Sequence, residues 1–389
     1  MKTCELIATS TFGLEAFVKK EVMELGYDIN SVENNKVFFT GDAEAIALCN
    51  IHLRCADRIL IKMGEFKATT FTELFDKVNA LPWEDWITPD AKFTVNGKSV
   101  KSGLYSVPDC QAITKKAIVK RLGEKYNMDH FPETGPAYTV EVSILKDIAT
   151  LTIDTTGKES LHKRGYRVAS VAAPLKETMA AALLKLSYWQ KGRILYDPCC
   201  GSGTFAIEAA LMAKNIAPGL YRNFACSTWP QIPKEMWDDL REEAKEMIST
   251  KGNPIIYASD VDRNAIAAAK QNAEAAGVAN CIQFFTKAIH KATLPHGDYG
   301  VIITNPPYGE RISDPVKTSK IHQDIRRLLD SNTTWSVYAL TSVDTFEREF
   351  GKKADKKRKL FNGNLRVDFY QYFGPKPPKD GENFQVIKK

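Results

Sequence analysis

The sequence predicts an α+β region over residues 1–165, followed by an α/β region built on a mostly parallel sheet. The chain of 389 residues is longer than one ordinary domain, since domains average roughly 100 to 200 residues. In the first region, short strands with alternating polar and apolar residues are interleaved with amphipathic helices. In the second region, nearly continuous apolar runs each precede a helical segment, which is typical of strands buried on both faces of a parallel sheet.

The elements of the first region are predicted from the period of their apolar residues. Strands are expected over residues 4–10, 36–41, 59–66 and 92–100, with two more inside 138–156 that meet near Lys146 and Asp147. Amphipathic helices are expected over residues 14–25, 43–55, 70–81 and 110–127. The last of these helices is rich in lysine and arginine.

Four buried strands are predicted in the second region, over residues 193–199, 254–260, 282–288 and 299–307. Near the end, Asn362-Gly363 lies between two apolar runs and is a strong hairpin signal. Residues 376–389 are expected to form a loose tail.

Composition excludes several classes of protein. No stretch reaches 18 uncharged apolar residues, so no membrane span is predicted, and residues 1–22 lack the features of a signal peptide. None of the eight cysteines forms a C-x-x-C pair with another, which favours free thiols in a reducing cytoplasm and predicts no metal site. The net charge of +6 does not by itself identify a nucleic-acid binder.

A glycine-rich turn follows the strand that ends at Asp197 and reads Asp-Pro-Cys-Cys-Gly-Ser-Gly-Thr. Such a turn lets the backbone approach a ligand closely and presents the N–H groups of a helix N-terminus. We therefore predict a nucleotide-cofactor site, and assign to it Asp197, Cys199, Gly201, Ser202, Gly203, Thr204 and Asp260.

Two carboxylates favour S-adenosylmethionine over a dinucleotide as this cofactor. A dinucleotide site expects an acidic residue about 20 positions after the glycine turn, whereas the carboxylate that ends the next strand is Asp260. Asp197 would sit poorly beside a pyrophosphate but suits an ammonium or sulfonium group. Asp260 is placed to accept hydrogen bonds from ribose hydroxyls.

The segment Asn305-Pro306-Pro307-Tyr308 follows a buried strand and predicts methylation of an exocyclic amine. The lone pair of an aryl amine is delocalised into its ring, so acceptors aimed at both N–H bonds favour a pyramidal, reactive nitrogen. The Asn305 side-chain oxygen and the Pro306 carbonyl are the predicted acceptors, held in place by the two prolines. Tyr308 is predicted to stack on a base drawn out of its helix.

With these motifs, the chain resembles class I methyltransferases that carry a ferredoxin-like piece and a THUMP RNA-binding domain, in particular the bacterial large-subunit rRNA guanine-N2 methyltransferases. The resemblance also rests on the segments 161–167, 173–178, 224–229, 257–262 and 359–363. It implies a Rossmann-like sheet of seven strands with an antiparallel last strand. It further implies a ferredoxin-like region at residues 1–60, a THUMP domain at 61–165 and a methyltransferase domain at 166–375.

The same resemblance implies transfer of a methyl group from S-adenosylmethionine to guanine N2 of 23S rRNA, as a step of rRNA processing. An RNA-binding role is expected for basic residues in or next to the THUMP region, namely Lys115, Lys116, Lys120, Arg121, Lys163, Arg164 and Arg167. One stretch departs from the pattern: Thr286-Lys287-Ala288 stands where many relatives place an acidic residue against the adenine.

Several alternatives remain open at the level of sequence. A tRNA guanine could be the substrate instead of rRNA. The same amine chemistry would serve a DNA adenine methyltransferase or a protein glutamine N-methyltransferase. A non-catalytic RNA-binding assembly factor is the alternative outside the enzymes, and the intact set of Asp197, Asp260 and Asn305 speaks against it.

Overall fold

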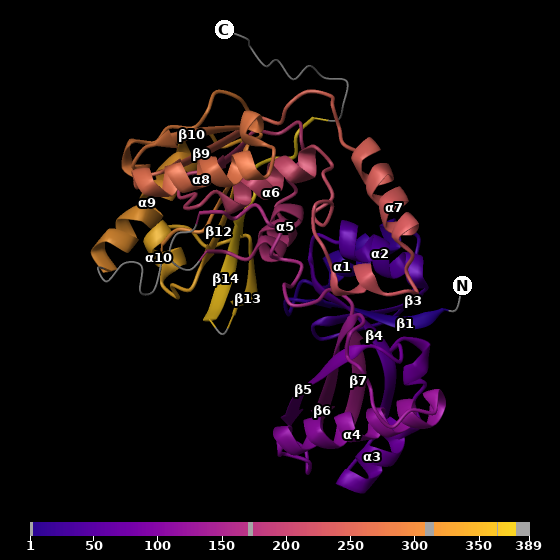
Figure 1. The fold of residues 1–389 in the computed structure, drawn as a ribbon. Helices are drawn as coiled ribbons and strands as arrows, with labels where there is room; N and C mark the ends of the chain where they lie inside the picture. The colour runs from indigo at the N-terminus through magenta and orange to yellow at the C-terminus, as the bar shows by residue number, and fades with distance from the viewer. Residues whose placement is uncertain (1–2, 170–173, 308–314, 364, 379–389) are drawn as a thin grey trace. The chain divides into compact units, whose positions relative to one another are not determined.

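The computed structural model describes residues 3–169, 174–307, 315–363 and 365–378 and contains two compact units (Figure 1). The first unit comprises the described residues of Met1–Ser10, Leu14–Leu161 and Pro218–Glu246. The second comprises those of Thr11–Gly13, His162–Ala217 and Met247–Lys389. Each unit has its own sheet, so each is considered separately.

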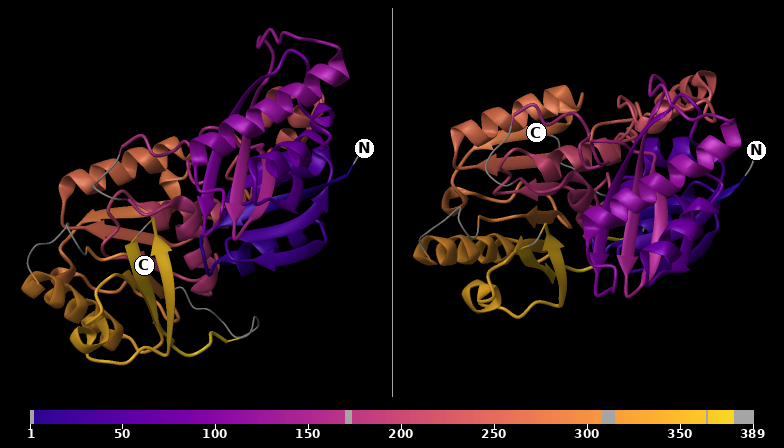
Figure 2. Two further views of the ribbon diagram at one scale, coloured as in Figure 1. Left: turned by 90° about the horizontal axis from the view of Figure 1, so that it is seen from below. Right: turned by 60° about the horizontal axis from the view of Figure 1, so that its bottom comes forward.

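The first unit is built on a seven-stranded sheet with the order β2-β3-β1-β4-β7-β6-β5. Its strands are β1 (Cys4–Ser10), β2 (Ile29–Glu33), β3 (Lys36–Gly41), β4 (Ala56–Lys67), β5 (Lys92–Val100), β6 (Ala137–Leu145) and β7 (Ile148–Asp154). Its helices are α1 (Glu15–Glu24), α2 (Ala43–His52), α3 (Phe71–Asn79), α4 (Val107–Tyr126) and α7 (Lys234–Glu246). Neighbouring strands are antiparallel except β5 and β6. Helix α4 packs along β5 and β6 (Figure 2).

Strand β4 joins the ferredoxin-like and THUMP regions into one sheet. It pairs with β1 from Ala56 to Ile61 and with β7 from Leu60 to Lys67. The expected boundary between the two regions, at residue 60, falls inside this strand. Backbone pairing therefore continues across the whole width of the sheet.

Residues 218–246 belong in sequence to the second region but pack in the first unit. The Gly219 amide donates to the Ile51 carbonyl oxygen at 2.8 Å. The Trp229 ring is fully buried and stacks on Tyr138, with ring centroids 4.4 Å apart. By sequence this segment lies inside the expected methyltransferase domain, so its packing in the first unit is a feature that the sequence did not reveal.

The second unit contains a seven-stranded sheet with the order β10-β9-β8-β11-β12-β14-β13. Its strands are β8 (Leu195–Asp197), β9 (Ile256–Asp260), β10 (Ile282–Thr286), β11 (Val301–Thr304), β12 (Ser336–Thr341), β13 (Lys356–Asn362) and β14 (Leu365–Tyr372). Its helices are α5 (Glu177–Leu186), α6 (Thr204–Ala213), α8 (Arg263–Ala275), α9 (Pro315–Ser331) and α10 (Phe346–Phe350). Strands β8 to β12 are mutually parallel, whereas β14 is antiparallel to both of its neighbours.

Helices of the second unit pack against the sheet through apolar side chains. α6 and α8 contact β8, β9 and β10. α9 and α10 share a hydrophobic core with β11, β12 and β14, to which they contribute Ile325, Leu328, Phe346 and Phe350. The buried sheet fixes the carboxyl ends of β8, β9 and β11, where the predicted site residues follow.

The predicted α/β fold with seven strands and an antiparallel last strand is confirmed. The predicted hairpin is formed by β13 and β14, but Asn362 ends a strand and pairs with Leu365, so the turn begins one residue later, at Gly363.

Strand β2 was not predicted, because four of its five residues are exposed and show no alternation of buried and exposed positions. Residues 379–389 of the expected loose tail lie outside the described residues. Within the described part of the chain, no helix is long and apolar enough to cross a membrane.

Candidate cofactor and base-methylation site

The glycine turn between β8 and α6 has the backbone geometry that the sequence predicted. Gly203 is the N-cap of α6 and has a φ of 86°, in the left-handed region that favours glycine. A Cβ at this position would lie 3.0 Å from the Ala269 Cβ. Gly201 also has a positive φ, of 52°. The two glycines therefore allow the turn to close tightly against α8.

Asp260 lies at the carboxyl end of β9, beside this turn. Its Oδ2 accepts a hydrogen bond from the Gly201 amide at 2.9 Å, and its Oδ1 accepts one from the Asp262 amide at 3.0 Å. Asp262 caps α8 by accepting from the Asn264 amide at 2.8 Å, as expected for an N-cap. These bonds fix the Asp260 carboxylate while leaving it lone pairs for a ligand.

Asp197 ends β8 and is almost completely buried, with 1% of its surface exposed. Burial raises the pKa of its carboxyl to about 7, while the Cys199 amide, which donates to Oδ1 at 3.2 Å, opposes that rise. No lysine, arginine or histidine of the described residues forms an ion pair with it. A buried carboxylate without a cation is costly, and a cationic ligand would relieve that cost.

Asn305 follows β11, the strand next to β8 on the side away from β9. Its side-chain Oδ1 is buried and accepts no hydrogen bond from the residues that the structure describes. Pro306 is buried and Pro307 half-buried. Tyr308, predicted to stack on the base, lies outside the described residues. An unpaired buried acceptor costs about 1 to 3 kcal/mol, so the position of Asn305 suits a donor supplied by a ligand.

A cavity of about 870 Å³ connects these groups at the carboxyl ends of the strands. Its wall includes Gly201, Asp260, Asn305 and Pro307. A smaller hollow of about 40 Å³ reaches Asp197 and shares Cys199, Gly201 and Asn305 with the larger cavity. The structure thus brings together the described members of the predicted catalytic and cofactor sets.

Sequence reasoning missed other residues that line the cavity. Lys317, Lys320 and Asp324 come from α9, and His290 from the short turn after β10. Their positions depend on which face of α9 points to the sheet. No motif marks that face, although the i, i+3 spacing of the two lysines places them on the same side of a helix.

The chain's own atoms fit an adenosine-containing cation. The buried Asp197 lacks a cationic partner among the described residues, Asp260 keeps acceptor capacity, and Gly201 lines the cavity without a side chain that would fill it. Ala288 and Ile289 also line the cavity. They offer backbone groups and an apolar surface to an adenine ring, in a stretch that carries no acidic residue. Ammonium, ribose and adenine groups can all find partners along this wall.

Arg164 and Arg167, two of the predicted RNA-binding residues, are held inside the second unit. Arg164 is buried and its Nε lies 3.5 Å from Glu208 Oε1. Arg167 forms an ion pair with Glu177, donates from Nη1 to Ser202 Oγ at 2.9 Å and from Nη2 to Thr204 Oγ1 at 3.2 Å. This corrects the expectation for Arg164, whose burial argues against a phosphate contact, and places Arg167 against the glycine turn at the start of α6.

The other predicted RNA-binding residues differ in their availability. Lys115, Lys116 and Lys120 are exposed on α4, and Lys163 is exposed in the segment after the first unit. Arg121 instead forms a two-point contact with Glu84, through Nε at 3.0 Å and Nη2 at 2.5 Å. Lys120 lies 3.8 Å from Glu124 in a solvent-exposed pair, which screens its charge only weakly, whereas the charge of Arg121 is largely neutralised.

Three family models match this chain. A model described as the RMKL-like methyltransferase domain matches residues 164–371. Models described as the RlmL ferredoxin-like domain and the THUMP domain match residues 5–60 and 68–154. The matched parts follow the order expected from the sequence.

The comparisons with individual proteins cover nearly the whole chain. A Bacillus subtilis (strain 168) protein named "Putative RNA methyltransferase YpsC" is 48% identical over 382 residues, which is 97% of this chain and 98% of the relative. The crystal structure of a "predicted N6-adenine-specific DNA methylase" from Listeria monocytogenes is 52% identical, covers 96% of this chain and 97% of its own, and has a TM-score of 0.91. The crystal structure of SMU.472, complexed with SAH, is 43% identical, covers 97% of this chain and 100% of its own, and has a TM-score of 0.92.

Proposed function

We propose, from the premise that this chain belongs to the THUMP-containing RNA methyltransferases with an RMKL-like methyltransferase domain, that it methylates guanine N2 in 23S rRNA. Its cofactor is S-adenosylmethionine, which supplies a methyl group activated by a sulfonium. We further propose that the protein acts on this RNA in the cytoplasm.

A single observation carries the amine specificity: the buried Asn305 Oδ1 accepts no hydrogen bond from the described residues. It lies at the end of β11 and lines the cavity that Asp260 also lines. An exocyclic amine entering the cavity would donate one N–H to Oδ1 and the other to the Pro306 carbonyl. Both acceptors would be in place before the reaction, which is how preorganised polar groups lower a barrier.

The cofactor is held by three groups in this scheme. The Asp197 carboxylate binds its ammonium group, and the Asp260 carboxylate accepts hydrogen bonds from its ribose. The adenine lies against Ala288 and Ile289, which line the cavity next to Asp260. In support, the SMU.472 structure, with 43% identity over nearly the whole chain, is a complex with SAH.

The reaction needs no strong general base. As the amine nitrogen bonds to the methyl group it becomes cationic and acidic, and it can release a proton to Asn305 or to water. The residues at the end of β11 therefore act by positioning the nitrogen, an effect that can contribute several kcal/mol.

RNA docking is assigned to Lys115, Lys116 and Lys120 on α4, within the part of the chain that matches the THUMP domain, and to Lys163. Lysines bind phosphates mainly by charge, so they position the RNA without reading its sequence. The ribosomal substrate is supported by the match of residues 5–60 to the RlmL ferredoxin-like domain.

The name of the Listeria monocytogenes protein favours a second candidate, N6-methylation of adenine in DNA. The same two acceptors would orient that amine. A THUMP domain and a relative named as an RNA methyltransferase favour RNA instead.

An in vitro transfer experiment separates these candidates. The purified full-length protein is incubated with S-adenosylmethionine and with deproteinised RNA or unmethylated DNA from cells that lack the gene. We expect N2-methylguanosine in the digested RNA and no product in DNA. N6-methyladenine in either nucleic acid, or N2-methylguanosine formed equally by an Asn305→Ala variant, would contradict the proposal.

A further inference from the structure

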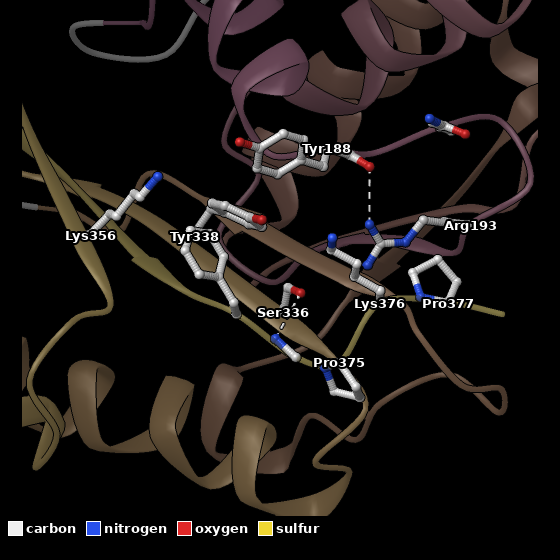
Figure 3. A pocket seen from close by; sticks show the side chains of 11 residues that line it. Tyr188, Arg193, Ser336, Tyr338, Lys356, Pro375, Lys376 and Pro377 are labelled. Atoms are coloured by element: carbon white, nitrogen blue, oxygen red, sulfur yellow. Dashed lines mark hydrogen bonds between the residues drawn. The ribbon is translucent and has the colours of Figure 1, made fainter. Parts of the chain in front are cut away.

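A second cavity lies at the opposite edge of the methyltransferase sheet from the cofactor cavity. It measures about 440 Å³ and is lined by Tyr188, Arg193, Tyr338, Lys356, Phe373 and Lys376 (Figure 3). Arg193 precedes β8 and Phe373 follows β14, so the cavity opens at the amino ends of the parallel strands. None of the residues assigned to methyl transfer lines it.

Tyr188 is held over this cavity by an unusual backbone conformation. It directly follows the C-cap of α5 and has a φ of 56°. Glycine or asparagine ordinarily occupies a left-handed position at the end of a helix, because a bulky side chain is strained there. The residue is nevertheless 61% exposed. The strained backbone thus presents an aromatic ring to solvent, where hydrophobic burial offers no compensation.

Two other aromatic rings complete an apolar wall. The Phe373 ring, 38% exposed, lies edge-on to Tyr188 with centroids 6.5 Å apart. Tyr338 is buried beneath, 6.2 Å from Phe373. A flat aromatic ligand could therefore contact exposed faces or edges of Tyr188 and Phe373.

Three cations surround the aromatic wall without carboxylate partners. Arg193 donates to the carbonyl oxygens of Tyr188 and Tyr299 at 3.0 and 2.7 Å, which fixes its guanidinium. Lys356 and Lys376 are exposed, and Figure 3 shows Lys356 on one side of Tyr188 with Lys376 and Arg193 on the other. No aspartate or glutamate of the described residues lines the cavity or pairs with these cations.

The neighbouring charges show that this lack of pairing is local. Lys357, next to Lys356 in β13, lies 3.3 Å from Asp368. The Asp355 carboxylate accepts a hydrogen bond from the Phe373 amide at 2.7 Å and so supports the wall of the cavity. Among the described residues, the three cations of the cavity thus have no carboxylate partner, although Lys357 next to Lys356 has one.

We propose that this cavity binds an unpaired nucleotide of the RNA substrate. The base stacks on Tyr188 and meets Phe373 at its edge, and the adjoining phosphates lie against Lys356, Lys376 and the edge of Arg193. Aromatic rings that stack bases beside cations that meet the backbone are the common arrangement of single-strand binding sites. The inference rests on the RNA substrate of the proposed function but not on the identity of the methylated atom.

The two cavities lie at opposite ends of the parallel strands. Strand β12 has six residues, so its ends are about 17 Å apart. The substrate must then extend past the target nucleotide along the methyltransferase unit. A substrate segment with an unpaired nucleotide beyond its target would be preferred over a short hairpin that carries the target alone.

Binding is tested with the full-length protein and a fluorescent ten-nucleotide oligouridine. Tyr188→Gly should weaken affinity about 10-fold, the loss expected for one stacked base, while Tyr188→Phe should bind like the wild type. The glycine variant relieves backbone strain, so its melting temperature should stay level or rise while its RNA affinity falls. Tyr221→Ala removes a tyrosine that is 78% exposed and not part of the cavity, and should have no effect.

Ultraviolet cross-linking locates the bound base. The wild-type protein should yield an oligouridine adduct on the peptide that contains Tyr188 or Phe373. The double variant Lys356→Ala with Lys376→Ala should lower the slope of log affinity against log salt concentration by the amount expected for about two phosphate contacts. Lys353 is exposed and lies outside the cavity, so Lys353→Ala should leave that slope unchanged.

Wild-type affinity in Tyr188→Gly together with adducts confined to other peptides would overturn the proposal. Uridine monophosphate binding as tightly as the oligomer would overturn it in favour of a free nucleotide. Neither readout depends on methyl transfer, so a failure to form N2-methylguanosine would refute the proposed function and leave this test unchanged.

Discussion

At the scale of single residues, Asp197 is a carboxylate whose charge depends on what the cavity holds. Its position before the glycine turn could be predicted from sequence, but its raised pKa could not, because that follows from complete burial. Asn305 is similar. Its motif was visible, whereas the absence of a partner for Oδ1 among the described residues required the fold.

Cofactor affinity should depend on the ionisation of Asp197. With a pKa of about 7 in the free protein, the carboxyl is mostly protonated at pH 6 and mostly ionised at pH 8. A cationic ligand binds the ionised form, so affinity for S-adenosylhomocysteine should rise about 10-fold from pH 6 to pH 8. Calorimetry with Asp197→Asn provides the control, since this variant should bind weakly with a flatter pH profile. An affinity of the wild type that does not change with pH would show that Asp197 does not bind the ammonium group.

Asn305→Ala should lower the single-turnover rate about 100-fold or more, the usual loss for one preorganised polar group. Its affinities for cofactor and RNA should stay near those of the wild type, because the acceptor acts mainly in the transition state. Asn305→Asp keeps acceptor oxygens and should retain more activity than alanine. An alanine variant that reacts at the wild-type rate would exclude the proposed role of Asn305.

At the scale of elements, a network of buried charges connects the segment after the first unit to the cofactor turn. Arg167 joins Glu177 at the start of α5 to Ser202 and Thr204. Sequence showed a basic segment and suggested phosphate binding. Whether such cations face solvent depends on where Glu177 and Glu208 lie in the fold, which composition does not reveal.

Arg167→Ala should destabilise the protein by about 3 to 5 kcal/mol, because it leaves the buried Glu177 without its cation. Burial raises the pKa of Glu177, and the Arg167 charge opposes that rise. Removing both charges in Arg167→Ala with Glu177→Gln should therefore recover a large part of the stability, as measured by urea unfolding. Additive losses from the two substitutions would show that the residues do not act as a pair.

At the scale of the whole molecule, residues 218–246 lie within the part of the chain that matches the methyltransferase model but pack in the first unit. Each parallel strand is marked by its own apolar run, and a motif at its end identifies the site. The segment 218–246 instead packs on elements far away in sequence, such as Tyr138. Its tryptophans indicate burial, but no local pattern says against what.

A fragment of residues 162–389 should aggregate if it keeps residues 218–246, because Trp229 and other apolar side chains would lose their partners. Replacing that segment with a short glycine-serine linker should yield a soluble fragment that binds the cofactor. The two stems lie close together, since the Ser249 amide donates to the Lys214 carbonyl at 2.7 Å and Asn215 Nδ2 to the Met247 carbonyl at 3.1 Å. Calorimetry and size-exclusion chromatography decide it, and a soluble unmodified fragment would contradict this packing.

The product that the protein makes in the cell distinguishes the candidate substrates. The most direct measurement is mass spectrometry of nucleosides from separated 23S rRNA and tRNA, taken from cells with and without the gene. We expect N2-methylguanosine to fall in 23S rRNA of the deletion strain, to stay level in tRNA, and to return with the wild-type gene but not with Asn305→Ala. Unchanged 23S rRNA with a loss confined to tRNA, or a loss of N6-methyladenosine instead, would contradict it.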